Sequence, residues 1–259
     1  MELETLILEQ DGELGIITFN RPEALNASNA QVVDELLMTI DFIEKEESIK
    51  AAIIWGGTKV FAAGGDIKYM IDGNPLKMEK FIAKCHAVCD NIANSKKPWV
   101  AAIAGLALGG GCEFALASDI RIAADNAVFG LPEINLGIIP GAGGTQRLSR
   151  VVGSGWARHM IMTGEMIDVQ TAFNIGLVTK VVPLDDLFET AKKTARGLAR
   201  KSTVAMAAAK KCIAMGESVD LPTGLAFEQK SWAMLYAGED QTEGMKAFLE
   251  KRRPNYTGK

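Results

Sequence analysis

The sequence has few residues of the kinds that build metal sites and disulfide frameworks. Its 259 residues include 4 cysteines and 2 histidines. The cysteines lie within apolar or helical patterns and lack the ligand spacing of zinc fingers. We therefore predict no metal site, and the cysteine usage favours a reducing, cytoplasmic location.

Basic charge and long hydrophobic runs are also scarce. The 28 Lys and Arg are outnumbered by 32 Asp and Glu, for a formal net charge of -4. This balance argues against nucleic acid or an anionic membrane as the main partner. No apolar run approaches the roughly 20 residues of a spanning helix, and no basic segment leads into an apolar one near Met1. We expect neither a membrane span nor a signal peptide.

Several common catalytic and nucleotide-binding motifs are missing. No glycine loop continues into Gly-Lys-Ser/Thr, and no Gly-x-Ser-x-Gly elbow occurs. The stretch GAGGTQRL at 141–148 has no strand directly before it, so it is a weak match to a dinucleotide fingerprint. His86 is interpreted as a helix-packing residue and His159 as a surface or core residue, because neither lies in a triad context.

Apolar strands alternate with amphipathic helices and glycine loops along the first two thirds of the chain. A helix is predicted over 30–47, with Ser28 or Asn29 as its cap. Strands are predicted at 5–10, 14–20, 50–57 and 98–105, with two more within 119–134. This order predicts an α/β architecture with functional loops at the carboxyl ends of the strands.

Only helices are predicted after about residue 185. They carry much apolar surface, which must be buried on the main body, on another copy of the chain, or on both.

Two glycine-rich stretches each follow an apolar strand: FAAGGDIKYM at 61–70 and AGLALGGGCEF at 104–114. Glycine lets the backbone approach a ligand closely, and a helix start offers free N–H groups. Two such loops could aim two donors at one oxygen, as an oxyanion hole does. The alternative is a pair of tight turns.

Two glutamates lie in apolar surroundings near these loops. Glu113 follows the glycines, and Glu133 follows a proline within FGLPEINLGIIPGAGG. Loss of solvation raises a carboxyl pKa toward neutrality, which suits a general acid or base. The alternative for each glutamate is a solvated or ion-paired side chain. Asp66 and Asp119 are weaker candidates, because capping explains a carboxylate at a helix or strand start.

Five stretches together resemble the crotonase (enoyl-CoA hydratase/isomerase) superfamily, in order and with fitting spacing from about residue 4 to residue 253. They are RPEALNA, FAAGGDIKYM, AIAGLALGGGCEFALASDIRIA, FGLPEINLGIIPGAGGTQRLSR and AFLEKRR. The resemblance implies an α/β spiral of ββα units over residues 1–195 and a helical trimerisation region over 196–259. It also implies a homotrimer, or a homohexamer built from two trimers.

The resemblance further implies an acyl-CoA substrate and no separate cofactor, since coenzyme A is part of the substrate. By motif, Gly65 and Gly110 would donate backbone N–H groups to the thioester oxygen, and Glu113 and Glu133 would be the catalytic pair of the hydratase branch. Further contacts to the CoA thioester would come from Ala24, Leu25, Ala27, Ala63, Asp66, Ile67, Lys68, Trp232 and Lys251. The last two would reach a neighbouring subunit's ligand.

Gly65 departs from the family, in which alanine is more common at this position. The N–H donor is kept, but glycine loosens the loop or enlarges the pocket. The expected reaction is reversible hydration of trans-2-enoyl-CoA to 3-hydroxyacyl-CoA. Alternatives are enoyl-CoA isomerisation, hydration of a cyclic dienoyl-CoA, and a non-catalytic CoA- or RNA-binding scaffold.

Overall fold

The computed structural model describes residues 2–259, and its strands form two sheets. The larger sheet has the order β1-β2-β3-β5-β7-β10, and the smaller one has the order β4-β6-β8-β9. In the larger sheet β1 and β2 are antiparallel and the remaining neighbours are parallel. Its strands are β1 (Leu6–Asp11), β2 (Leu14–Phe19), β3 (Ala51–Trp55), β5 (Trp99–Ile103), β7 (Ile120–Ala124) and β10 (Lys180–Val182).

The smaller sheet explains how the glycine loops are held. Each of three consecutive units places its first strand in the larger sheet and its second in the smaller one, before a helix or a 3-10 turn follows. This confirms the predicted spiral of ββα units. The second strands are three residues long. The first two lie within segments that sequence patterns describe only as loops, whereas the third falls within 119–134, where two strands are predicted. These second strands are β4 (Val60–Ala62), β6 (Leu106–Leu108) and β8 (Val128–Gly130), joined at the edge by β9 (Ile167–Asp168).

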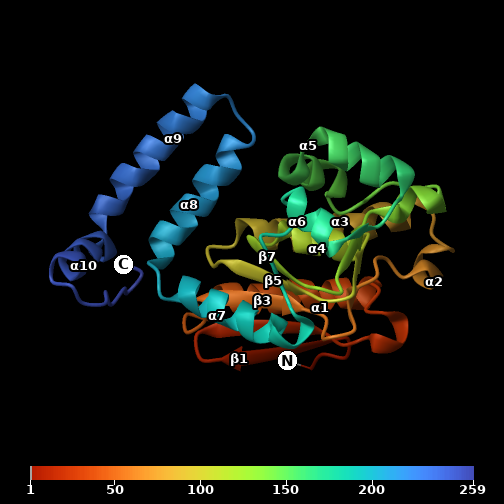
Figure 1. Ribbon diagram of the computed structural model, residues 1–259, viewed down its shortest axis with the longest axis horizontal. Helices are drawn as coiled ribbons and strands as arrows, with labels where there is room; N and C mark the ends of the chain where they lie inside the picture. Colours follow the sequence, from red (N-terminus) through yellow and green to blue (C-terminus); the bar gives the residue numbers. More distant parts are fainter. Residues whose placement is uncertain (1) are drawn as a thin grey trace.

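Helices cover both faces of the larger sheet (Figure 1). Asn29 accepts a hydrogen bond from the Val32 N–H at 3.0 Å and caps α1, which confirms one of the two predicted caps. The helices of the main body are α1 (Ala30–Lys45), α2 (Ile67–Met70), α3 (Pro75–Asn94), α4 (Gly110–Ala117), α5 (Gly144–Thr163), α6 (Val169–Asn174) and α7 (Leu187–Ala199). α7 buries its alanine face on the larger sheet, opposite α1, α3 and α4.

A buried arginine holds the carboxyl end of α4. Arg121 on β7 is 8% exposed, and its guanidinium donates to the carbonyl oxygens of Ser118 at 2.7 Å and Ala115 at 3.4 Å. A third bond goes to the Leu177 carbonyl at 2.7 Å. A cation at this position adds donors to carbonyls at the end of the helix and is favoured by the helix dipole. The opposite end of α4 begins at Gly110.

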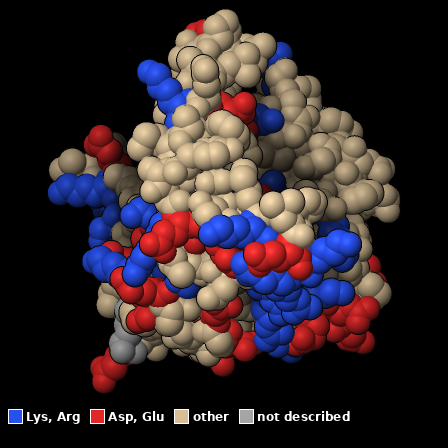
Figure 2. All heavy atoms as spheres, turned by 90° about the vertical axis from the view of Figure 1, so that its left-hand side faces the viewer, with Lys and Arg blue, Asp and Glu red and all other residues tan. Residues whose placement is uncertain are grey.

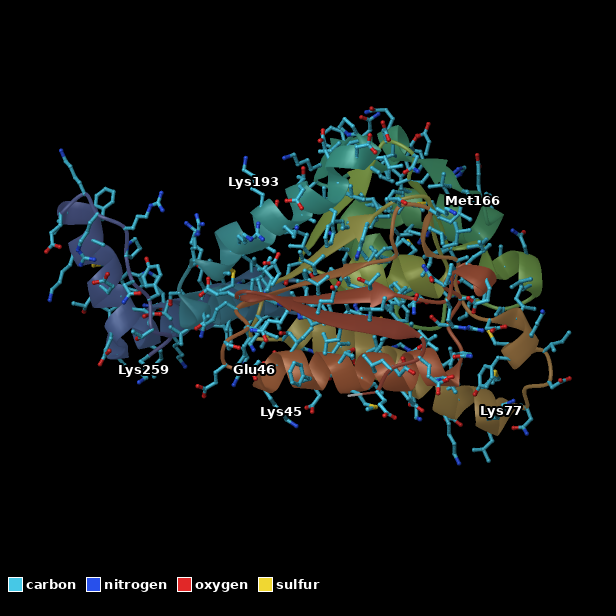
Figure 3. All side chains as sticks on the ribbon, turned by 90° about the horizontal axis from the view of Figure 1, so that it is seen from below. Lys45, Glu46, Lys77, Met166, Lys193 and Lys259 are labelled. Carbon is cyan, nitrogen blue, oxygen red and sulfur yellow. The ribbon has the colours of Figure 1, made fainter. Side chains whose placement is uncertain are left out.

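The last helices extend away from the main body (Figure 1). They are α8 (Thr203–Gly216), α9 (Leu221–Met234) and α10 (Glu239–Leu249). Seen from below, Lys259 lies beside these helices at one end of the molecule, and Lys77 on α3 lies at the other (Figure 3). Lys210 on α8 links them to the core, because its ammonium contacts Asp119 at 2.8 Å. Among residues 2–259, none of the helices has the length and apolar character of a membrane span.

Candidate active site

A cavity of about 1000 Å³ opens between the two glycine loops, α3 and the loop that leads into α5. Its size suits an organic ligand of moderate size, and its walls are mainly apolar. Among the described residues, no group of three or more His, Cys, Asp and Glu is arranged to hold a metal ion.

The two glycine loops meet at this cavity. Gly64 and Gly109 have φ of 100° and 50°, so each loop turns at a residue whose conformation favours glycine. The loops are close, because a β-carbon added to Gly110 would lie 3.9 Å from the Gly64 carbonyl carbon. Gly111, the next residue, would place a β-carbon 2.2 Å from the Ala62 carbonyl oxygen, so only glycine lets α4 approach β4 this closely.

Gly65 and Gly110 both carry backbone N–H groups that the local structure leaves available. Gly110 is the first residue of α4, so its N–H has no acceptor within the helix. At the bridge between Ser28 and Gly65, the Ser28 N–H donates to the Gly64 carbonyl at 2.8 Å and the Asp66 N–H donates to the Ser28 carbonyl at 2.9 Å. The bridge therefore does not use the Gly65 N–H. Two available donors therefore border one cavity from neighbouring loops.

Glu113 is held in one position at the back of the cavity. It is 2% exposed, and its Oε1 accepts hydrogen bonds from the N–H groups of Ala142 at 2.7 Å and Gly144 at 2.6 Å. Burial raises the pKa of Glu113, and the two N–H donors counteract that rise by stabilising the carboxylate. Both donors lie at the start of α5, where the helix dipole also favours a negative charge.

Glu133 has a different environment. It lies on the 3-10 helix Pro132–Leu136, and its Oε2 is buried without a hydrogen-bond partner. Its Oε1 lies 3.0 Å from where a β-carbon on Gly109 would be, so this carboxyl is beside the Gly110 loop. Burial raises the pKa of Glu133 to about 7, and the nearby Glu113 carboxylate adds to the rise. At neutral pH Glu133 is therefore able to carry a proton, while donors favour the charged form of Glu113.

The structure places the residues implied by the family resemblance in two groups. Those that line the cavity are Ala63, Gly65, Ile67, Gly110, Glu113 and Glu133. The remaining positions near the glycine loop, Ala24, Leu25, Ala27, Asp66 and Lys68, lie outside the lining. The Ala63 N–H donates to the Leu25 carbonyl at 3.0 Å, so the two segments are in direct contact.

Asp66 and Asp119 have structural partners. Asp66 caps α2 by accepting the Lys68 and Tyr69 N–H groups, and it contacts Arg21 at 3.1 Å. Asp119 accepts the Trp99 N–H at 2.7 Å and faces Lys210. The expectation that local capping explains the carboxylate of Asp66 is confirmed.

Trp232 and Lys251 lie in the C-terminal helical region. Trp232 is 61% exposed on α9, and Lys251 follows α10. Neither lines the cavity of its own chain. A role for them in ligand binding requires a second copy and stays a prediction.

Two features of the site escape sequence patterns. The first is the clamp on Glu113 by Ala142 and Gly144, although the glycines of 141–148 before α5 were a usable signal for a close backbone approach. The second is His86, whose interpretation as a packing residue is wrong. It is exposed on α3 and lines the cavity, near enough to Glu113 for a positive charge on the imidazole to lower the pKa of that carboxyl.

The family of the chain follows from comparison with known proteins. The model of the enoyl-CoA hydratase/isomerase family matches residues 9–259, and the chain belongs to that family. It is 44% identical to a short-chain-enoyl-CoA hydratase of Clostridium acetobutylicum, over 98% of this chain and 97% of the relative. It is 40% identical to a crotonyl-CoA hydratase of Syntrophomonas wolfei over the full length of both.

Solved structures agree with this assignment. The crystal structure of an enoyl-CoA hydratase from Bacillus anthracis superposes with a TM-score of 0.95 at 37% identity. The match covers 99% of this chain and 100% of that one.

Proposed function

We propose that this enzyme hydrates trans-2-enoyl-CoA thioesters reversibly to 3-hydroxyacyl-CoA. The observation that carries the proposal is the pair Glu113 and Glu133, in contrasting environments beside two available N–H donors in one cavity. Relatives named as enoyl-CoA and crotonyl-CoA hydratases support the same reaction.

In this mechanism the thioester oxygen accepts the N–H groups of Gly65 and Gly110, which form an oxyanion hole for the enolate-like charge. Glu113 accepts a proton from a water molecule while the oxygen of that water bonds to C3 of the acyl group. Glu133 donates its proton to C2. The product has gained one water. The glutamate pair still holds one proton, which is now on Glu113 and returns to Glu133 through solvent.

The proposed reaction is tested with a panel of CoA thioesters. We expect loss of the conjugated enoyl absorbance with short, unbranched trans-2-enoyl-CoA, and recovery of 3-hydroxyacyl-CoA. Turnover restricted to a 3-enoyl-CoA would instead indicate an isomerase, and turnover restricted to cyclic dienoyl-CoA would indicate a specialised hydratase. CoA binding without any turnover would indicate a scaffold.

The pH dependence of kcat/KM reports the proton shared by the pair. Because the pKa of Glu133 is raised to about 7, we expect kcat/KM to fall as pH rises through about 7 and the pair loses its last proton. Hydration consumes no net proton, so dehydration of the 3-hydroxyacyl-CoA must show the same falling limb. Steady-state rates between about pH 6 and 9 measure it. A flat profile in this range would contradict the assignment of Glu133.

We also propose that copies of the chain associate through α8–α10 as a homotrimer or homohexamer. Few charged side chains occur on the upper part of the face that these helices present (Figure 2). Large exposed apolar residues on this region are Val204, Ile213, Leu221, Leu225, Trp232, Met234, Tyr236, Met245, Phe248 and Leu249. Such a surface is typical of a protein–protein interface. Association through these helices would bring Trp232 and Lys251 within reach of the CoA bound by a neighbouring subunit.

Two further parts of the proposal concern chemistry and location. The mechanism uses no cofactor other than the coenzyme A that the substrate carries. A cytoplasmic location is consistent with four cysteines that form no disulfide, three of which are buried.

A further inference from the structure

Met70 lies directly against Gly65. A β-carbon added to Gly65 would lie 2.6 Å from Met70 Sδ and 3.8 Å from Met70 Cε, and nothing else is within 4 Å. A carbon cannot occupy that position while the sulfur stays where it is. The thioether therefore fills the space that any other residue at position 65 would need.

The position of Met70 is set by the short helix on which it lies. Asp66 caps α2, and the Met70 carbonyl accepts the Gly73 N–H at 2.9 Å. Gly73 makes a second close contact, because a β-carbon there would lie 2.6 Å from Met78 Cγ. Two methionines thus pack against two glycines on the segment between β4 and α3.

Both methionines line the cavity, together with the apolar side chains Phe81 and Ile82 of α3. Tyr69 packs on Phe81 with ring centroids 5.1 Å apart, so α2 is joined to this wall. An acyl chain whose thioester oxygen is bound at Gly65 must extend along these apolar side chains. Of these side chains, Met70 is the one that packs directly against Gly65.

We propose that Gly65 and Met70 act as a pair that determines acyl-chain specificity. Without a β-carbon at position 65, the Met70 thioether lies back on the loop and leaves room for long acyl groups. The inference rests on the proposed function, because it concerns the acyl group of the same thioester.

The physical basis is the mobility of the methionine side chain. Its three rotatable bonds let it fill an irregular space or leave it. A methyl group at position 65 would force the sulfur away from the loop, and the open side is the cavity. The room lost is on the scale of a methylene group, which changes the preference between acyl chains by about tenfold or more.

A double-mutant cycle tests the coupling of the two residues. We would measure kcat/KM for crotonyl-CoA and trans-2-decenoyl-CoA in the wild type, G65A, M70A and G65A/M70A. We expect G65A to lower the decenoyl-to-crotonyl ratio by about tenfold. Removing the thioether should abolish that effect, so M70A and the double variant should show equal ratios. G197A is the matched control, because a β-carbon at Gly197 on α7 meets nothing within 4 Å.

A ratio that G65A leaves unchanged would overturn the proposal. So would an effect of G65A that is the same whether or not the M70A substitution is also present. Any change common to both substrates cancels in the ratio, so an effect of G65A on the N–H donor does not imitate the result. Dissociation constants of butyryl-CoA and decanoyl-CoA, which cannot be hydrated, give the same ratio without turnover. They separate failure of this inference from failure of the proposed reaction.

Discussion

Glu113→Gln and Glu133→Gln are each expected to lower kcat for crotonyl-CoA hydration by about 10²–10⁴. An amide cannot take the proton of the attacking water, and it cannot deliver one to C2. In E113Q the amide oxygen can still accept the Ala142 and Gly144 N–H groups, so the local fold should persist. In E133Q a buried oxygen that already lacks a partner is retained in a neutral group.

The matched control is Glu79→Gln, on the exposed side of α3 and outside the cavity lining. It makes the same Glu→Gln change at an exposed position away from the cavity and should leave kcat within a few-fold of the wild type. Steady-state rates and thermal melting are measured on all three variants. If E113Q and E133Q hydrate crotonyl-CoA nearly as fast as the wild type while folded, the two glutamates do not carry the reaction.

Gly110→Pro is expected to lower kcat/KM by about 10²–10³ or more, because it removes one of the two proposed N–H donors. Proline is well tolerated at the first residue of a helix, where its missing N–H has no intrahelical acceptor. Gly110 occupies that position in α4. The substitution therefore removes the donor at a place where the helix itself does not use it, although the ring also occupies space toward the ligand.

Gly110→Ala distinguishes loss of the donor from added bulk. An alanine β-carbon would lie 3.9 Å from its nearest neighbour, the Gly64 carbonyl carbon, which is an ordinary contact. G110A keeps the N–H and should retain far more activity than G110P. Equal losses in the two variants, with unchanged melting temperatures, would show that space and not the N–H group matters at this position.

The strands of the larger sheet, apart from its edge strand β10, and the catalytic candidates could be predicted from residue patterns. Strand-length apolar runs such as 50–57 and 98–105 are buried on both faces, and that is why their signal is continuous. The two glycine loops and two apolar-context glutamates were also visible. Each of these features lies within a short run of residues, so the composition and spacing of that run are enough to indicate it.

The smaller sheet and the contacts that hold the glutamates could not be predicted in the same way. β4 and β6 are too short for any periodicity to develop, and β8 was expected only as one of two strands within 119–134, with no sign that it joins a second sheet. The bonds from Ala142 and Gly144 to Glu113 join residues about thirty positions apart, and the donors are backbone atoms with no sequence signature. His86 was misassigned because a helical position alone does not say which face meets a cavity.

The buried guanidinium of Arg121 has a consequence for how variants of this enzyme should be interpreted. It binds the carboxyl end of the helix whose first N–H is proposed to bind the thioester oxygen, so it resists sliding of that helix along its axis. A sub-ångström slip would misalign the donor with the reacting carbonyl without unfolding anything. A substitution that removes the Arg121 contacts would then slow turnover as well as lower stability, although it lies outside the cavity lining.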